Sequence, residues 1–147
     1  MVFNGAYTRS VTTVSARNPS SGTRSSDFPI MPNDVENFPT DHPDRMGPFA
    51  AESGWAFPYL YDESQEVAKE WSAACTPDFF LLDGEGHLFY AGQFDSSRPG
   101  DGVEATGTDL RAAVNALLND GEAPGGSSPS SGCNIKWKEG NEPPYFG

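Results

Sequence analysis

Two cysteines are the side chains of this chain best suited to covalent chemistry. Cys75 stands two residues before Pro77, where an apolar run rich in Phe and Leu begins, and Cys133 stands in a later segment that contains several aromatic residues. Thiolates attack disulfides and peroxides, and a second thiol resolves the product. The pair therefore indicates thiol redox chemistry, although free cysteines also occur as small buried apolar residues. A Cys75–Cys133 disulfide stays open, because a sequence does not place two sulfurs within bonding distance.

Pro77 marks a point where a strand is about to start. Proline lacks the N–H that a central strand donates, and the bond before it is the one peptide bond where the cis form is cheap. The apolar run 79–82 reads as a strand, 83–86 as a tight turn, and 87–91 as the returning strand of a β-hairpin. Cys75, Thr76 and Pro77 are therefore expected just before a buried strand.

The rest of the chain alternates expected strands and helices. Asp62 and Gln65 form a capping-box pattern before one helix, and Thr106 and Asp109 cap a later helix that Gly121 ends. The elements expected outside the hairpin are a strand over 27–31, a short or kinked helix after Pro43, a brief strand over 57–61, a helix with Val67, Ala68 and Trp71 facing inward, and a last helix with the apolar stripe Leu110, Val114, Leu117 and Leu118.

Composition excludes several classes of partner. The chain of 147 residues has a net charge of −12, which argues against nucleic acid because phosphate binding needs clustered Lys and Arg. No apolar run is long enough to span a bilayer, so we expect no membrane partner and, by default, a cytoplasmic protein. His42 and His87 are distant in sequence from both cysteines, so we expect no metal and no cofactor. Asp62, Asp83 and Asp95 are interpreted as caps and turns.

Composition also divides the chain into segments. Residues 1–26 carry three arginines and no acid, a charge of +3, whereas the remaining six basic and 21 acidic residues give −15. This stretch lacks periodicity, and three interpretations stay open: a disordered tail, a transit peptide, and a segment read out of frame. We expect one domain over 27–121, a flexible Gly/Ser/Pro-rich linker over 122–131, and a tail over 132–147 that packs back on the domain.

Several stretches together resemble one protein family. The segment 73–82 resembles the Thr–cis-Pro strand of thioredoxin-fold proteins, and with 132–138 it resembles the peroxiredoxin-like branch of the thioredoxin superfamily. Further similar stretches are 33–37, 57–63 and 93–99. The resemblance implies an α/β thioredoxin-like fold with an incomplete N-terminal part. It also implies peroxide reduction or thiol–disulfide exchange, with a peroxide or a protein or small-molecule disulfide as substrate and a thioredoxin-type reductant.

The reactive cysteine of that family is missing from its expected place. In the family it lies at the N-terminus of the first long helix, where the helix dipole favours the thiolate. That place falls near residues 3–7, where Asn4 and Tyr7 fit the family's pattern but no cysteine is present. The resemblance therefore implies an impaired oxidoreductase, in which Cys75 acts slowly as nucleophile and Cys133 resolves.

Thr76 and Pro77 have two interpretations. The resemblance implies that they shape a loop presenting backbone to a substrate peptide or thiol, whereas the structural alternative is a simple strand start. The alternative function is a non-catalytic module that binds an extended peptide at this loop. A third alternative is an unstable product, because loss of a first strand and helix leaves a sheet face and an edge exposed.

Overall fold

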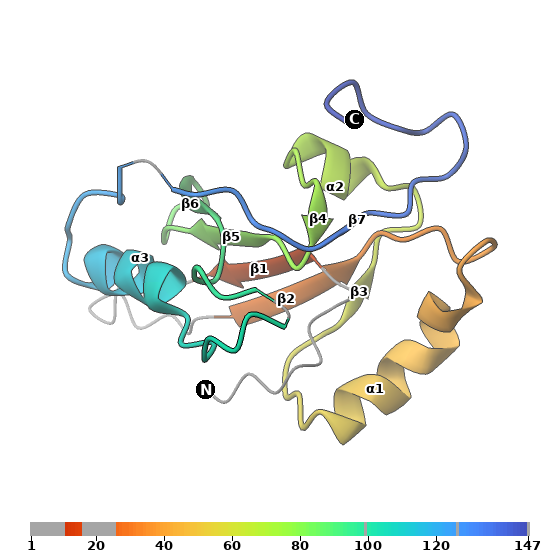
Figure 1. Ribbon diagram of the computed structural model, residues 1–147, viewed down its shortest axis with the longest axis horizontal. Coiled ribbons are helices and arrows are strands. Elements are labelled where there is room, and N and C mark those ends of the chain that lie inside the picture. Colours follow the sequence, from red (N-terminus) through yellow and green to blue (C-terminus); the bar gives the residue numbers. More distant parts are fainter. Residues whose placement is uncertain (1–10, 16–25, 99, 126, 147) are drawn as a thin grey trace.

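The protein is a mixed α/β structure built around a five-stranded sheet. The computed structural model describes residues 11–15, 26–98, 100–125 and 127–146. The large sheet has the strand order β3-β2-β1-β5-β6, and β4 and β7 form a separate two-stranded sheet (Figure 1). The strands are β1 Val11–Ser15, β2 Ser26–Met31, β3 Leu60–Tyr61, β4 Cys75–Thr76, β5 Phe79–Leu82, β6 Leu88–Gly92 and β7 Cys133–Asn134. The helices are η2 Pro39–Asp41, η3 Pro43–Arg45, α1 Met46–Glu52, α2 Glu66–Glu70 and α3 Thr108–Leu118.

The central strand of the large sheet is one that the sequence does not predict. β1 pairs antiparallel with β2 and parallel with β5, inside the stretch 1–26 that was expected to be without strands. Its Val and Thr residues are β-branched and favour a strand where a neighbour is present on each side. Five residues are too few for that preference to stand out in a polar stretch. The expectation is corrected for Val11–Ser15, whereas residues 1–10 and 16–25 lie outside the described residues, so their interpretations stay predictions.

The predicted hairpin is confirmed. β5 pairs antiparallel with β6, and the returning strand begins at Leu88 instead of at His87. Asp83 holds the turn, because its Oδ1 accepts hydrogen bonds from the backbone N–H groups of Glu85 (2.8 Å) and His87 (2.9 Å). The strands expected over 27–31 and 57–61 are also present, the second reduced to the two residues of β3.

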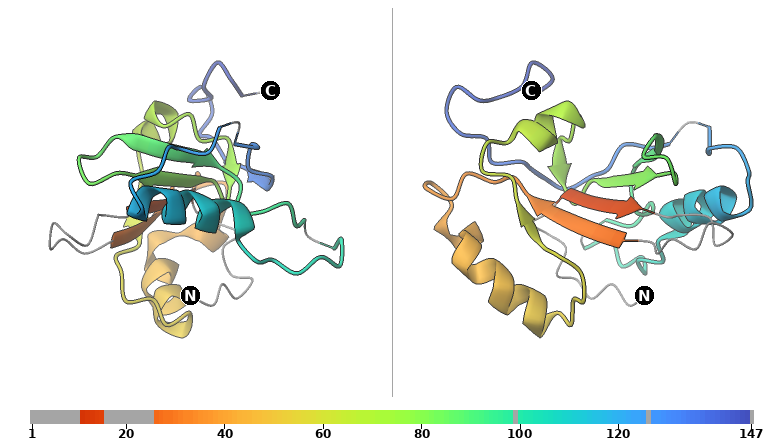
Figure 2. Two further views of the ribbon diagram at one scale, coloured as in Figure 1. Left: turned by 90° about the vertical axis from the view of Figure 1, so that its left-hand side faces the viewer. Right: turned by 180° about the vertical axis from the view of Figure 1, so that it is seen from behind.

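The helix expected after Pro43 is short, as predicted. It consists of the 3₁₀ turn η3 followed by α1, in which Pro48 is the third residue. The first N–H groups of a helix have no intrahelical acceptor, so a proline is tolerated near this end. Figure 2 shows α1 outside β3, at the opposite end of the molecule from α3.

The start of α2 differs from its predicted cap. Asp62 accepts a hydrogen bond from the N–H of Ala68 (2.9 Å) and does not form a capping box with Gln65. Gln65 takes a left-handed conformation (φ 63°), and its side chain is fully buried. Ala68 is buried and Trp71 packs against the core, as expected, but Val67 is 37% exposed and its predicted inward direction is wrong.

The cap of α3 comes from a more distant residue than predicted. Asp95 Oδ2 accepts hydrogen bonds from the N–H groups of Thr106 and Gly107 (2.6 Å each). Asp109 instead accepts a hydrogen bond from a glutamine side chain at the end of β6. The apolar stripe of α3 packs inward except for Leu118, which is 38% exposed. Among the described residues, no helix combines the length and the apolar character that a membrane crossing requires.

Two hydrophobic clusters lie on opposite faces of β5, because alternate strand residues point to opposite sides. We call them the helix core and the tail core. The helix core consists of Phe79, Leu81, Tyr90, Leu110 and Ala113. The tail core consists of Ala68, Ala73, Phe80, Ile135 and Trp137. Figures 1 and 2 show α3 on one side of the sheet, and α2 with the C-terminal segment on the other.

Candidate functional site

The small β4–β7 sheet brings all four predicted site residues together. In this antiparallel pair Thr76 lies opposite Cys133, and Cys75 lies opposite Asn134. The Thr76 hydroxyl donates a hydrogen bond to the carbonyl oxygen of Cys133 (3.4 Å). Pro77 follows directly, and the Thr76–Pro77 peptide bond is cis, which confirms the isomer expected there. The site therefore joins two segments that are more than fifty residues apart in sequence.

The two thiols occupy opposite environments. Cys75 is 6% exposed, whereas Cys133 is exposed, and both are free. Burial raises the pKa of the Cys75 thiol to about 12, and the nearby Asp78 and Cys133 add to the rise. The Cys75 thiol is therefore protonated at neutral pH, and it contacts the carbonyl oxygen of Pro77 (3.7 Å). A buried, protonated thiol is a poor nucleophile, so the surroundings of Cys75 do not favour the attacking role predicted for it.

The register also keeps the two sulfurs apart. Residues directly opposite in an antiparallel pair place their side chains on the same face, and successive residues alternate. Cys133 therefore shares a face with Thr76, and Cys75 shares the other face with Asn134. A disulfide between the two cysteines requires β7 to move relative to β4.

Asp78 is a site residue that the sequence analysis missed. It is 9% exposed, and its Oδ2 accepts a hydrogen bond from the N–H of Ala74 (3.2 Å). Burial raises the pKa of Asp78, while hydrogen bonds from Ser130 and from the backbone of Ala74 and Phe79 act in the opposite direction. Asp78 thus links the loop before β5 to the segment that leads into β7. Its position directly after the proline was the available signal.

Gln65 is a second residue that sequence reasoning placed in the wrong role. Its Nε2 donates hydrogen bonds to the carbonyl oxygens of Pro32 (2.7 Å) and Lys136 (2.9 Å). Its Oε1 accepts hydrogen bonds from the N–H of Lys138 (2.9 Å) and from Asn141 Nδ2 (2.8 Å). One buried amide therefore fastens the segment after β7 to the domain. No local pattern reveals this role, because three of the partners lie more than seventy residues away.

Asn33, in the loop after β2, strengthens the same attachment. Its Oδ1 accepts a hydrogen bond from the N–H of Lys136 (3.0 Å), and the N–H of Asp34 donates to the carbonyl oxygen of Lys136 (2.7 Å). The side chains of Asn33 and Asp34 are both buried. Hydrogen bonds to the Asp34 carboxylate, of which that from the Asn37 side chain is the strongest, hold the pKa of Asp34 below its ordinary value. The loop after β2 and the segment after β7 are therefore fixed to each other.

The linker before β7 also contacts the sheet. The N–H of Gln93 donates to the carbonyl oxygen of Ser128 (3.0 Å), and the Ser130 hydroxyl donates to the carbonyl oxygen of Gly92 (2.7 Å). In Figure 1 this segment returns from α3 past β6 to β7. The stretch 122–131 was expected to be a flexible linker, and in its described part it is seated at the end of β6.

The three aspartates that were interpreted as caps and turns have those roles. Asp62, Asp83 and Asp95 accept backbone N–H hydrogen bonds at the starts of α2 and α3 and in the hairpin turn. Among the residues that the structure describes, no three His, Cys, Asp or Glu side chains are grouped so that they could hold a metal ion.

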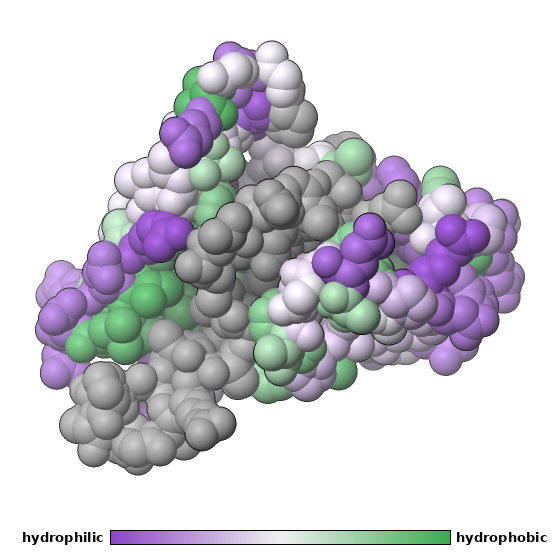
Figure 3. Space-filling model, turned by 90° about the horizontal axis from the view of Figure 1, so that it is seen from below, coloured by the Kyte–Doolittle hydropathy of each residue, from purple (hydrophilic) through white to green (hydrophobic). Residues whose placement is uncertain are grey.

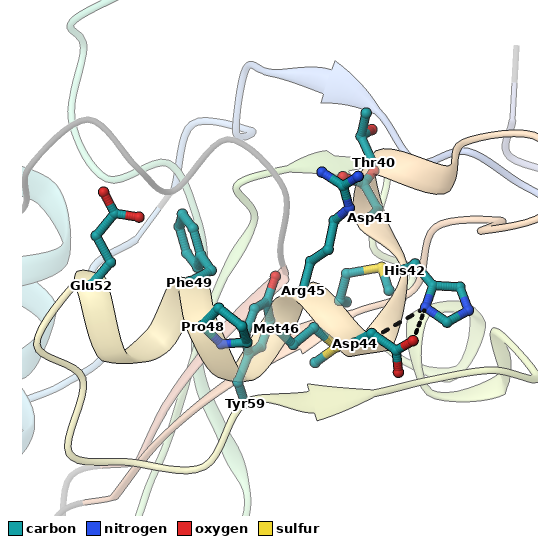
Figure 4. A pocket seen from close by; sticks show the side chains of 11 residues that line it. Thr40, Asp41, His42, Asp44, Arg45, Met46, Pro48, Phe49, Glu52 and Tyr59 are labelled. Atoms are coloured by element: carbon teal, nitrogen blue, oxygen red, sulfur yellow. Dashed lines mark hydrogen bonds and ion pairs between the residues drawn. The ribbon is translucent and has the colours of Figure 1, made fainter.

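A cavity of about 320 Å³ lies apart from the cysteines. It is lined by residues of η2, η3 and α1, together with Met31 and Tyr59 (Figure 4). Its wall mixes acidic and basic side chains, and His42 Nδ1 accepts a hydrogen bond from the N–H of Asp44 (3.3 Å). None of the four predicted site residues lines this cavity. It therefore provides no substrate space next to either thiol.

Exposed apolar side chains come from several elements. Leu60, Leu88 and Val103 are 44–59% exposed and come from β3, β6 and the loop before α3. Figure 3 shows one larger apolar patch at the left and smaller apolar places elsewhere among hydrophilic side chains. Single exposed apolar side chains are normal on a protein surface.

Comparison with known proteins finds similar solved structures. A hypothetical protein from Sinorhizobium meliloti 1021 is 39% identical, with a TM-score of 0.77, over 92% of this chain and 83% of that chain. An uncharacterized conserved protein from Geobacillus kaustophilus is 40% identical, with a TM-score of 0.76, over 89% of this chain and 80% of that chain. No family model and no curated protein matches the sequence.

Proposed function

We propose that this chain, which belongs to the same family as the Sinorhizobium meliloti and Geobacillus kaustophilus proteins, is a thiol-based oxidoreductase of the peroxiredoxin-like type. The proposal includes a thioredoxin-like fold. It is supported by the resemblance of 73–82 and 132–138 to that superfamily and by a cis proline in front of a β-hairpin that is followed by a helix. The substrate is a peroxide or a disulfide, and an external dithiol of the thioredoxin type is the reductant.

The single observation that carries the proposal is the pairing of the two cysteine-bearing strands beside the cis proline. Because Cys133 is exposed and Cys75 is buried, the proposal gives the attacking role to Cys133 and the resolving role to Cys75, the reverse of the sequence-based prediction. No described helix begins next to Cys133, so no helix dipole favours its thiolate. We therefore expect slow chemistry.

The reaction balances as a two-step exchange. The Cys133 thiolate attacks one sulfur of a disulfide R–S–S–R, so that a Cys133–S–S–R bond forms while R–S⁻ leaves and takes up a proton. The Cys75 thiol then loses its proton and attacks the Cys133 sulfur, which releases a second R–SH and forms a Cys75–Cys133 disulfide. The external dithiol reduces this disulfide and is itself oxidised. With a hydroperoxide the first step gives a Cys133 sulfenic acid and an alcohol, and condensation with Cys75 releases water.

The test compares two cysteine variants. We expect Cys133→Ser to slow reaction with 5,5′-dithiobis(2-nitrobenzoate) and consumption of hydroperoxide about tenfold or more, because the remaining thiol is buried and protonated. Cys75→Ser should keep the first step and stop the chain at the mixed disulfide, which mass spectrometry detects. Unchanged rates in Cys133→Ser would exclude the proposed attacking thiol.

A second candidate, a non-catalytic module that binds an extended peptide beside the cis proline, is favoured by one observation. β4 already holds an extended segment of this chain, β7, as its paired strand. An unlabelled peptide with the sequence of residues 130–138 should then shift the backbone NMR signals of position 75 and of Thr76 in a Cys75→Ser/Cys133→Ser chain. Unperturbed signals at millimolar peptide would reject this candidate.

A further inference from the structure

Gly132, the residue before β7, lies very close to the backbone of the cis-proline loop. A Cβ atom added at this residue would lie closer than 3.0 Å to the carbonyl oxygen of Thr76 and 2.7 Å from the Thr76 carbonyl carbon. Both obstacles are backbone atoms, which cannot turn aside as a side chain can. Gly132 therefore lets the chain lie flat on β4, and any larger residue lifts it away.

The segment around Gly132 has two very different halves. Residues 130–134, which we call the strap, are held by the two-residue ladder with β4, by the hydrogen bond from the Thr76 hydroxyl to the Cys133 carbonyl oxygen and by the contacts of Ser130. Cys133 and Asn134 of the strap are both exposed. Directly after the strap, Ile135 and Trp137 are buried in the tail core, and Gln65 holds the backbone of the following residues.

This difference in contacts determines where the segment opens most easily. Releasing the strap breaks few hydrogen bonds and uncovers little apolar surface, so it belongs to the low free-energy end of local opening. Releasing the following residues uncovers Ile135 and Trp137 and removes the hydrogen bonds of the buried Gln65 amide to Lys136, Lys138 and Asn141. The strap therefore opens locally while the rest of the segment stays docked.

We propose that Gly132 is a positioning residue that seats the strap over Cys75, and that local opening of the strap is the step that gives the Cys75 thiol access to Cys133. The closed strap lies directly beside Cys75, since Asn134 is the ladder partner of that residue. In the closed state the two sulfurs are on opposite faces of the ladder. In the open state Cys133 turns freely about the docked residues that follow it.

Opening of the strap regulates the proposed oxidoreductase reaction, and this regulatory role rests on the proposed function. The mixed disulfide on Cys133 stays unresolved while the strap is closed, because Cys75 is covered. Opening lets the Cys75 sulfur attack the Cys133 sulfur and expel the second thiol of the substrate. The frequency of strap opening then limits the resolving step.

The experiment measures alkylation of each cysteine by iodoacetamide in the full chain under native conditions, followed by mass spectrometry. Gly132→Ala should label Cys75 about tenfold faster than wild type, whereas Cys133 should change little. Gly125→Ala is the matched control, because a Cβ at this linker glycine meets nothing within 4 Å. Equal Cys75 labelling in wild type and Gly132→Ala overturns the proposal.

A second measurement does not depend on the folding of any variant. Cys75 labelling in wild type is followed in rising urea below the unfolding transition. Local opening of the strap predicts a shallow dependence on urea, whereas a slope equal to that of global unfolding overturns the proposal. Neither measurement needs a substrate. If the protein does not react with disulfide or peroxide, the proposed function is wrong but strap opening is unaffected. If it does react but Cys75 labelling shows no local opening, only the proposed opening of the strap is wrong.

Discussion

The two faces of β5 are closed in different ways. The helix core is covered by α3, which follows β6 directly in the chain, whereas the tail core is completed by Ile135 and Trp137 from the C-terminal segment. The first closure uses an amphipathic helix. The second uses a segment with little regular structure, held by Gln65 and Asn33. The comparison teaches that a short irregular segment closes a core when buried polar side chains supply the hydrogen bonds that a helix makes internally.

Removing the tail core's largest side chain tests this comparison most severely. Trp137→Ala should lower the free energy of unfolding by about 3–5 kcal/mol, because a buried aromatic side chain leaves a cavity. Leu110→Ala, in the helix core, should cost about 2–5 kcal/mol. Urea unfolding measures both. The discriminating readout is Cys75 alkylation below the transition, which should rise in Trp137→Ala and stay low in Leu110→Ala.

Trp137→Phe separates ring packing from polarity at the same position. The indole Nε1 of Trp137 is buried and has no hydrogen-bond partner among the described residues. Phenylalanine keeps an aromatic ring and removes this N–H, so it should cost clearly less than alanine. An equal cost for both variants would contradict packing as the main contribution of Trp137.

Loss of the Gln65 hydrogen bonds should have the next largest effect on the free energy of unfolding. Gln65→Leu should cost about 2–4 kcal/mol, because it removes the hydrogen bonds of a buried amide to the backbone groups of Pro32, Lys136 and Lys138. Gln93→Leu is the counterpart beside α3, where the lost partners lie nearer to solvent, and it should cost about half as much or less. Urea unfolding gives the two values. A larger loss in Gln93→Leu would reverse the proposed contrast.

The contributions of Asp95, which caps α3, and Asp78, beside β4, to the free energy of unfolding should change with pH in opposite directions. Burial acts to raise the pKa of Asp95, but hydrogen bonds from Ser97, Gly107 and Thr106 hold it below its ordinary value of 3.8. Its stabilising contribution is therefore complete above 3.8 and is lost as pH falls through the lower, folded-state value. Burial raises the pKa of Asp78, so its contribution is complete below 3.8 and is lost as pH rises through the higher, folded-state value.

Unfolding free energies measured across this pH range check both signs. Asp95→Asn should flatten the loss of stability on the acid side of 3.8. Asp78→Asn should flatten the decline on the alkaline side of 3.8. If the unfolding free energy depends on pH in both variants as it does in wild type, groups other than Asp95 and Asp78 govern that dependence.

The smallest effects are expected at two residues whose burial the sequence predicts wrongly. Val67 and Leu118 are each more than a third exposed. Val67→Ser and Leu118→Ser should therefore change the unfolding free energy by about 0.5 kcal/mol or less. A loss of about 2 kcal/mol at either residue would mean that the side chain is buried in solution.

The difference between local and long-range interactions also explains how much of the fold the sequence predicts. The hairpin of β5 and β6 and the helix α3 are recognisable because their periodicity and turn residues are local. The cis bond before Pro77 is expected from resemblance to a known strand. Local signals fail for the cap of α3, because Asp95 reaches across a loop to Thr106 and Gly107.

The candidate site is less predictable than the fold. Cys75, Thr76, Pro77 and Cys133 do come together, but the reactivity of a thiol depends on burial and neighbouring charge. Those conditions at Cys75 are set by Asp78 and by the strand that pairs beside it, and neither is visible in the spacing of two cysteines. We therefore propose Cys133 as the attacking thiol only after its surroundings and those of Cys75 are known.

The long reach of Gln65 has a consequence for the order in which the molecule assembles. Its bonds to Lys136, Lys138 and Asn141 span 71, 73 and 76 residues, whereas the contacts of the helix core join neighbouring elements. Contacts between distant parts of a chain close larger loops and form later than local ones. The hairpin and α3 should thus come together first, and Trp137 fluorescence should report the last event of folding.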